Sequence, residues 1–320
     1  MISRKALVVG INYYKNIAHL QGCVKDAYAI QSVLNRHSDG SKNFDIKLKV
    51  ANSEQDIVEK KALKNEVEAL FKDNSEIALF YFSGHGYISS TGGYLITSDC
   101  KDGDDGLSMN ELLEIVNESH AKNKIIVLDC CHSGEFGNFQ QTAYNNAMLS
   151  EGTTILTASG KNEYAIENND AGLFTILFID AMNGSASDLI GNITPGSIYA
   201  HIDQSLGAWE QRPIFKTNVE TFITLRKVKP PISLSDLKKL VELFPLKGEP
   251  CKLDPTYEPE SKNPNKENVA KFKLLQKYNR INLVVPVDAE HMYFAAMESK
   301  SCKLTILGEH YWNLIEKERI

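Results

Sequence analysis

Two segments of the chain place an imidazole and a thiol directly after apolar runs that predict β-strands. In the first, SGHG at residues 83–86 sets His85 between two glycines after IALFYF, and in the second, DCCHSG at 129–134 follows KIIVL. A thiol reacts as its thiolate, so a nucleophilic cysteine needs a nearby base and some access. Glycine on each side of His85 lets other backbone approach closely. These residue types are those of a Cys–His pair for acyl transfer.

The adjacent cysteines at 130 and 131 have two interpretations. On composition alone both are small buried hydrophobic residues, because buried unreactive cysteines are common. The histidine motif at a second strand end favours catalysis, with Cys131 as nucleophile and Cys130 pointing into the sheet. Gly134 and the turn after Cys131 are then candidate donors of backbone N–H groups to an oxyanion, and Gly86 leaves room beside His85.

The elements that must position these residues alternate along the first two-thirds of the chain. Short apolar runs predict strands at 5–11, 44–50, 77–83, 124–129, 153–158 and 221–225. Longer segments with helical spacing lie between them, at 24–37, 59–72, 108–119, 172–184 and 194–206. Strands separated by helices predict an α/β fold with a mostly parallel sheet covered on both faces. Ligands bind such sheets at the carboxyl ends of the strands, so His85 and Cys131 can meet there if their strands are neighbours.

The pattern changes after Pro230-Pro231, which we interpret as a linker. Residues 232–320 read as two helical stretches followed by helix, strand and helix, and their ending is weakly similar to a winged-helix domain. From Pro230 onward 14 basic side chains stand against 13 acidic ones, so protein contact is favoured over DNA. Tyr311 and Trp312 are interpreted as core residues in preference to a base-stacking platform.

Composition excludes several classes of protein. The chain has 320 residues, a net charge of −6 and six cysteines without metal-ligand spacing. Nucleic acid binding and zinc are therefore not favoured, and the cysteines indicate reduced thiols in a cytoplasmic protein. No apolar run approaches the roughly 18 residues of a spanning helix, so no membrane partner is expected.

Three motifs in order, LQGCVKDA at 20–27, SGHG and DCCHSG, resemble the caspase-like clan of cysteine peptidases (peptidase C14 type). Within that clan the chain is similar to metacaspases and their bacterial relatives. The resemblance covers about residues 4–226 and implies a caspase-like sandwich, with a central mostly parallel sheet flanked by helices, in a domain at 1–228. The C-terminal winged-helix-like α+β domain at 232–320 would serve interaction or regulation.

The resemblance also assigns roles by position. It implies that His85 and Cys131 form the catalytic dyad and that Asp26 and Asp129 line an acidic S1 pocket, so that cleavage follows Arg or Lys. Two carboxylates attract a guanidinium through charge-assisted hydrogen bonds. The alternative for Asp26 is a solvated acid in the first turn of a helix. Three further residues are candidates for the substrate cleft: Cys23, Ser159 and Glu163.

Calcium is a candidate cofactor, although none is required by the dyad. Several metacaspases bind Ca²⁺ through clustered aspartates, and an acidic loop here contains Asp99, Asp102, Asp104 and Asp105. Carboxylate oxygens suit Ca²⁺. A solvated acidic turn explains the same residues equally well, because the family's further acidic position after the cysteine is Asn138 here.

Regulation is expected to differ from family members that cut the linker between their lobes. Residues 125–160 contain no Lys or Arg, so a basic-P1 peptidase finds no site there and activity should not need that cut. By analogy with the family the protein is an effector of a bacterial defence or stress pathway, with protein substrates and a regulatory protein partner on the C-terminal domain. The alternatives are a silent caspase-fold adaptor and a DNA-binding regulator.

Overall fold

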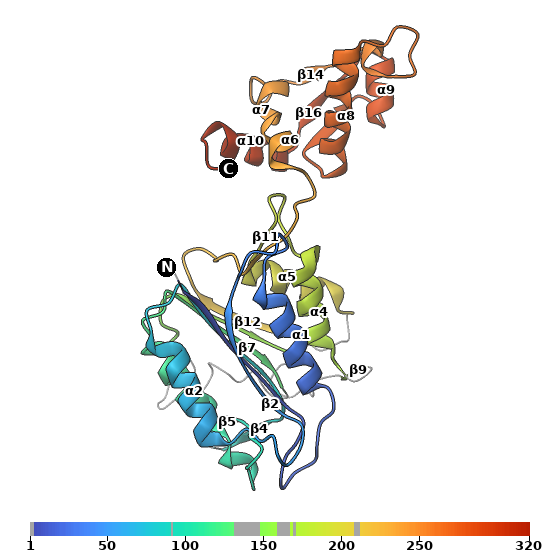
Figure 1. Cartoon of the computed structure of the whole chain (residues 1–320). Coiled ribbons are helices and arrows are strands. Elements are labelled where there is room, and N and C mark those ends of the chain that lie inside the picture. Colours follow the sequence, from blue (N-terminus) through green and yellow to red (C-terminus); the bar gives the residue numbers. More distant parts are fainter. Residues whose placement is uncertain (1–2, 91, 131–147, 159–166, 169–170, 208–211) are drawn as a thin grey trace. The chain divides into compact units, whose positions relative to one another are not determined.

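The computed structural model describes residues 3–320 apart from 91, 131–147, 159–166, 169–170 and 208–211 (Figure 1). The chain divides into two compact units, Met1–Lys229 and Pro230–Ile320. Each unit has its own sheet and helices. Within the described ranges no helix is long and apolar enough to cross a membrane.

A six-stranded sheet forms the centre of the first unit, in the order β12-β8-β7-β3-β1-β2. Its strands are β1 (Arg4–Ile11), β2 (Asp45–Ala51), β3 (Ile77–Ser83), β7 (Asn123–Asp129), β8 (Thr153–Thr157) and β12 (Ile214–Asn218). The first five run parallel, and β12 pairs antiparallel with β8. The predicted mostly parallel sheet is confirmed.

Helices cover both faces of this sheet, which explains the continuous apolar strands. Helices α1 (Cys23–Asn35), α4 (Leu173–Asp180) and α5 (Pro195–Ser205) pack on one face, and α2 (Lys60–Lys72) and α3 (Met109–Asn117) on the other (Figure 1). Strand side chains alternate between the two cores. Tyr81 and Val127 join the α1 side, whereas Phe82 and Leu128 join the α2 side. The period of two therefore decides which face each residue of the site enters.

The strand predicted at 221–225 is wrong, because the antiparallel edge strand is β12 at 214–218. The backbone of 221–225 finds other partners: Arg4 Nη2 donates to the Thr224 and Leu225 carbonyls, and Asn43 Nδ2 donates to Leu225 O. Leu225 itself is buried in the α1-side core. The apolar run at 221–225 is therefore packed against the core without pairing as a strand. Strand β12 is only partly buried, so its sequence is less apolar and does not stand out.

Short elements complete the first unit around the ends of the main strands. A small antiparallel sheet follows β3 and contains β4 (Gly86–Ser89), β5 (Gly92–Leu95) and β6 (Leu107–Ser108), with a 3₁₀ turn at Gly103–Asp105. The pair β9 (Glu167–Asn168) and β10 (Ala171–Gly172) leads directly into α4, whose last turn continues as a π-turn at Ala181–Ser185. Strands β11 (Asn192–Ile193) and β13 (Arg226–Lys227) form a second two-stranded pair.

The second unit packs helices on a three-stranded antiparallel sheet of order β14-β16-β15. In chain order it contains α6 (Leu234–Lys238), α7 (Leu240–Leu243), β14 (Cys251–Lys252), a 3₁₀ turn (Pro255–Tyr257), α8 (Lys266–Arg280), β15 (Val284–Val287), α9 (Met292–Met297), β16 (Ser301–Leu304) and α10 (Ile306–Glu316). The predicted helix, strand and helix at its end are present. Tyr311 is buried and Trp312 donates its indole N–H to Phe244 O, as core residues do.

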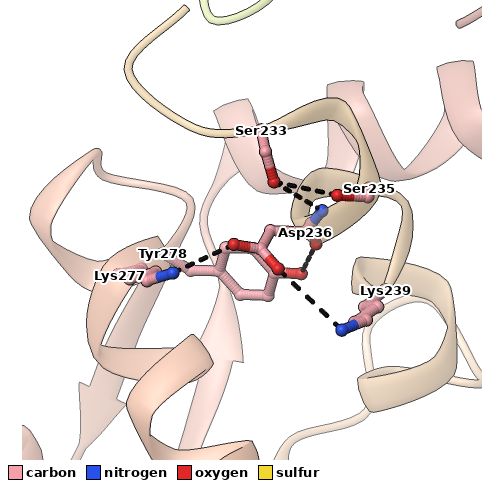
Figure 2. A network of polar contacts seen from close by, with 6 residues as sticks. All are labelled: Ser233, Ser235, Asp236, Lys239, Lys277 and Tyr278. Carbon is pink, nitrogen blue, oxygen red and sulfur yellow. Dashed lines mark hydrogen bonds and ion pairs between the residues drawn. The ribbon is translucent and has the colours of Figure 1, made fainter.

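A polar network fixes the first helix of this unit to α8 (Figure 2). Ser233 caps α6 by accepting the Asp236 N–H at 3.0 Å. The Asp236 carboxylate binds Lys277 Nζ at 3.0 Å, and its backbone carbonyl accepts the Tyr278 hydroxyl. The hydrogen bond from Lys277 lowers the pKa of Asp236 below its usual value. The chain is therefore anchored within a few residues of the proline pair.

Candidate active site

The strands that precede the two motifs are neighbours, as the sequence requires. Strands β3 and β7 are parallel and in register, with Ser83 opposite Asp129, and β1 lies on the other side of β3 with Gly10 opposite Ser83. After β1 the chain adds β2 on one side of β1 and then β3 on the other side. The direction in which strands are added therefore reverses between β1 and β3. Reversals of this kind leave a crevice at the carboxyl edge, where ligands bind.

His85 is held from two directions between β3 and β4. Its backbone N–H donates to the Tyr14 hydroxyl at 2.8 Å, and its ring packs against the Tyr14 ring with centroids 4.8 Å apart. Its Nε2 lies 2.9 Å from the Ala18 carbonyl. Because a carbonyl only accepts, Nε2 is the donor in this contact, and in the neutral ring Nδ1 is the nitrogen left to accept a proton. A general base needs such a nitrogen.

Gly84 explains why SGHG has a glycine before the histidine. A Cβ at this position would lie 2.8 Å from the Tyr14 hydroxyl and 2.9 Å from Cζ of the Phe82 ring. Both neighbours are buried. Any larger residue would therefore push against the group that holds the His85 backbone.

Two buried carboxylates meet on the α1 side of the same edge. Asp26, in the first turn of α1, is 4% exposed, and Asp129, the last residue of β7, is 6% exposed. Both approach Gly172: its N–H donates to Asp26 Oδ2 at 3.3 Å, and a Cβ there would lie 2.4 Å from Asp129 Oδ2. Ser83 lies 3.5 Å from Asp26 Oδ2. Asp26 is thus buried within the fold, unlike the solvated helix acid that was its alternative.

A buried hydroxyl chain ties Asp129 to the sheet. Thr175 Oγ1 donates to Asp129 Oδ2 at 2.5 Å, and it also shares a 2.6 Å hydrogen bond with the Tyr81 hydroxyl. Burial raises the pKa of Tyr81 well above its usual value, and the negative charges of Asp129 and Asp26 raise it further. Tyr81 therefore stays protonated, and it experiences both carboxylates as one negative region.

Cys130 lies on the face that the strand period requires. Cys130 is 1% exposed and belongs to the α2-side core with Leu128 and Phe82, so its predicted position in the sheet environment is confirmed. Cys131 lies outside the described residues, as do Gly134, Ser159 and Glu163. Cys23 begins α1 and is buried at 5% exposure beneath the strand ends. Gly86 begins β4, where it pairs with Leu95.

The acidic loop is not organised as the predicted calcium site. Asp99 Oδ1 accepts from the Lys60 N–H and the Thr97 hydroxyl, which fixes it as a local cap. Asp105 and Asp102 cap the ends of the 3₁₀ turn at 103–105 reciprocally, and Asp104 lies within that turn. No group of three or more potential metal ligands occurs among the described residues. The turn alternative fits Asp102 and Asp105 better, because their carboxylates accept backbone N–H groups of the loop.

Sequence reasoning missed the residues that hold the site together. Tyr14, Tyr81 and Thr175 come from three separate segments. Tyr81 lies in an apolar run and Thr175 in a predicted helix, so the sequence alone indicates that both belong to the packed core. The Ala18 carbonyl carries no side-chain signal at all. A tyrosine buried at the end of an apolar run was the available clue, because a buried hydroxyl needs a partner.

The arrangement of a histidine and two buried acids at one edge of a mostly parallel sheet agrees with a comparison of the sequence with known families. A family model described as the caspase domain matches residues 3–228. The chain belongs to the caspase-domain family. Members of this family are cysteine peptidases, so the catalytic residue types found here have a known context. No curated protein matches the sequence as a whole.

Solved structures show the same fold at low sequence identity. A crystal structure of a protein from Geobacter sulfurreducens is 14% identical, with a TM-score of 0.51, and the match covers 71% of this chain and all 100% of that one. Caspase-1 from Spodoptera frugiperda is 10% identical, also with a TM-score of 0.51, and the match covers 71% of this chain and 91% of that one. These similarities support a caspase-like fold for the first unit.

Proposed function

We propose that this caspase-domain protein is a cysteine endopeptidase that cleaves its protein substrates after Arg or Lys. In the proposed reaction Nδ1 of His85 takes the proton of the Cys131 thiol, and the thiolate attacks the scissile carbonyl. The protonated His85 then gives that proton to the departing amine, leaving an acyl-enzyme. Water, deprotonated by His85, releases the new carboxylate and restores the thiol. Backbone amides near Cys131 and Gly86 would stabilise the oxyanion.

One observation carries the specificity: Asp26 and Asp129 are both buried and both reach Gly172 at the edge where His85 lies. Two carboxylates in low dielectric repel one another and favour a cation between them. A guanidinium forms bidentate hydrogen bonds with such groups, and an ammonium pairs with them as a point charge. An acidic P1 side chain would add a third negative charge, so cleavage after Asp is excluded by this proposal.

The adaptor alternative is less favoured, because a fold kept only for binding has no need of these particular groups together. Burying the two carboxylates of Asp26 and Asp129 at one strand edge is costly, and a scaffold gains nothing from that cost. The DNA-binding alternative has no support from the near-neutral second unit. We therefore keep the second unit, winged-helix-like in our proposal, as a binding module for a regulatory protein.

The test uses fluorogenic peptides that differ only at P1, with Arg, Lys, Gln or Asp, and the intact chain. We expect turnover with Arg and Lys, and none with Asp or with the Cys131→Ala variant. Asp129→Asn and Asp26→Asn should each lower kcat/KM for the Arg peptide by about 10- to 100-fold, because one charge-assisted hydrogen bond is lost. The Gln peptide is the matched control, and its slow cleavage should change little in these variants.

Two results would contradict the proposal in different ways. If the Cys131→Ala variant still cleaves the Arg peptide, Cys131 is not the nucleophile. If the Asp and Arg peptides are cleaved equally, Asp26 and Asp129 do not form an S1 pocket for a basic side chain. Activity should also persist without a cut between residues 125 and 160, because no basic residue lies there. Mass spectrometry of the active protein checks this point. The proposal also includes a cytoplasmic effector role with a protein partner on the second unit. A pull-down that compares the full chain with a chain lacking the second unit tests this partner.

A further inference from the structure

Two cysteines face each other across the sheet of the second unit. Cys251 on β14 and Cys302 on β16 are directly opposite in the antiparallel register. Leu253 N–H donates to Lys300 O at 2.8 Å, and hydrogen-bonded pairs recur at every second position of such a ladder. Cys251 and Cys302 are therefore a hydrogen-bonded pair, whose Cα atoms lie about 5.5 Å apart. Disulfides need a Cα separation of roughly 4.4–6.8 Å, so the Cα spacing of Cys251 and Cys302 lies within the range of a disulfide, and only a small local shift is needed to bring the sulfurs together.

Both thiols are free in this structure, and their surroundings differ. Cys302 is fully buried, whereas Cys251 is half-buried. The neighbouring Cys302 thiol lowers the pKa of Cys251, and the nearby charge of Lys271 on α8 lowers it further, although burial opposes both. The Cys251 sulfur in turn raises the pKa of Cys302, as does the burial of Cys302. One sulfur is thus prepared to be a thiolate and the other to remain a thiol.

The other three cysteines that the structure describes lack this combination. Cys23, Cys100 and Cys130 are buried in the first unit, and burial is also what raises the pKa of Cys100. Of the cysteines within the described residues, Cys251 alone is not buried. A thiol is reactive where a nearby cation favours its thiolate form and solvent can reach it. The resolving thiol, which forms the disulfide after oxidation, lies beside it.

We propose that Cys251 and Cys302 form a redox-active thiol pair, in which a peroxide oxidises Cys251 and Cys302 closes a reversible disulfide between β14 and β16. The Cys251 thiolate attacks one oxygen of hydrogen peroxide and the O–O bond breaks, so that Cys251 becomes a sulfenic acid. The other oxygen leaves as hydroxide, which takes up the proton that the Cys251 thiol had released and becomes water. The Cys302 sulfur then attacks the Cys251 sulfur, the S–O bond breaks, and a second water leaves. A dithiol reductant reverses the process by exchange.

The consequence is a covalent link across the second unit that depends on oxidant. The bond would close a loop from β14 through α8, β15 and α9 to β16, which holds most of the unit. A link of this kind stabilises the unit by limiting its unfolded chain. The second unit would then report peroxide to whatever partner or activity it controls.

The test treats the full-length Cys131→Ala protein with hydrogen peroxide, so that a reactive thiol at 131 does not compete. After quenching and alkylation, non-reducing digestion and mass spectrometry should find the peptide with Cys251 linked to the peptide with Cys302. Dithiothreitol should restore both thiols. A Lys271→Gln substitution should slow formation of the link several-fold, because the thiolate loses its neighbouring cation.

Two matched variants separate the roles of the two sulfurs. In Cys302→Ser, Cys251 should accumulate as a sulfenic acid that dimedone traps, and in Cys251→Ser, Cys302 should remain a thiol at the same peroxide concentration. The proposal is overturned if the Cys131→Ala protein with both thiols present gives no 251–302 disulfide while Cys251 is oxidised further to sulfinic acid. It is equally overturned if neither thiol reacts with peroxide, or if Cys302 is oxidised as readily when Cys251 is absent.

Discussion

The hydroxyl of Tyr14 is the sharpest place to test how His85 is positioned. Tyr14→Phe keeps the ring, and with it the 4.8 Å packing against the imidazole, but removes the oxygen that accepts the His85 N–H at 2.8 Å. Burial raises the pKa of Tyr14 well above its usual value, so the wild-type hydroxyl is protonated at any working pH. The substitution therefore changes one hydrogen bond and no charge.

The expected size follows from the burial of that hydrogen bond. Tyr14 is 1% exposed, and an N–H left without a partner in such a place costs about 1–3 kcal/mol of folding free energy. The same loss releases the backbone beneath the imidazole, and a displacement of about 1 Å in a catalytic group can cost on the order of 100-fold in rate. We expect kcat for an Arg peptide to fall by about 10- to 100-fold, with KM changed less than about threefold, because the acids of the proposed S1 pocket are held by other residues.

Tyr81→Phe is the matched control. It also removes one buried hydroxyl of the same sheet, but that hydroxyl contacts Thr175 beside Asp129 and not His85. Its stability loss should be similar, while its effect should appear in KM for the Arg peptide and leave kcat within about threefold. Kinetics on both variants, at a temperature where calorimetry shows each to be folded, decide the matter. If the two variants lower kcat equally, Tyr14 is structural and the positioning argument is refuted.

Three further predictions concern the same structure. Gly84→Ala should lower both the melting temperature and kcat, because its Cβ would lie 2.8 Å from the Tyr14 hydroxyl; an unchanged kcat would mean that the loop adjusts freely. Asp236→Asn should lower the melting temperature of the second unit at pH 7 by the equivalent of roughly 1 kcal/mol or less. Because the pKa of Asp236 is lower in the folded than in the unfolded protein, its carboxylate stabilises the fold at pH values above the unfolded-state pKa. This stabilisation is lost as the pH falls through the folded-state pKa, so calorimetry should show the melting temperatures of wild type and variant converging below about pH 4. EGTA should leave turnover of the Arg peptide unchanged, since the loop aspartates already bind backbone donors, and a loss that Ca²⁺ restores would contradict this.

Much of the first unit could be predicted from the sequence. Strands such as 77–83 and 124–129 are buried at every residue because both faces of a parallel sheet are covered, and their apolar runs at 77–82 and 125–128 are visible in the sequence. The motifs after them are local too, so their common edge followed from topology alone. The run at 221–225 misled because an apolar run reports burial, and burial does not require a strand.

The calcium hypothesis for the acidic loop also depends on a property that the sequence pattern does not carry. Four aspartates within seven residues indicate where negative charge lies, but not where each carboxylate points. In the fold, Asp99 accepts the Lys60 N–H at the start of α2 and Asp105 accepts the Asp102 N–H of its own loop, and a sequence pattern cannot distinguish these contacts from binding a cation.

What the sequence determined by itself was the set of elements, the edge on which chemistry lies and the family to which the first unit belongs, because strand period and short motifs are properties of neighbouring residues. Only the tertiary structure decided that Asp26 and Asp129 meet at Gly172, that Tyr14 holds His85, and that Cys251 faces Cys302. Each of these contacts joins residues distant in the chain, and their pairing depends on sheet register and packing, which are set by the whole fold.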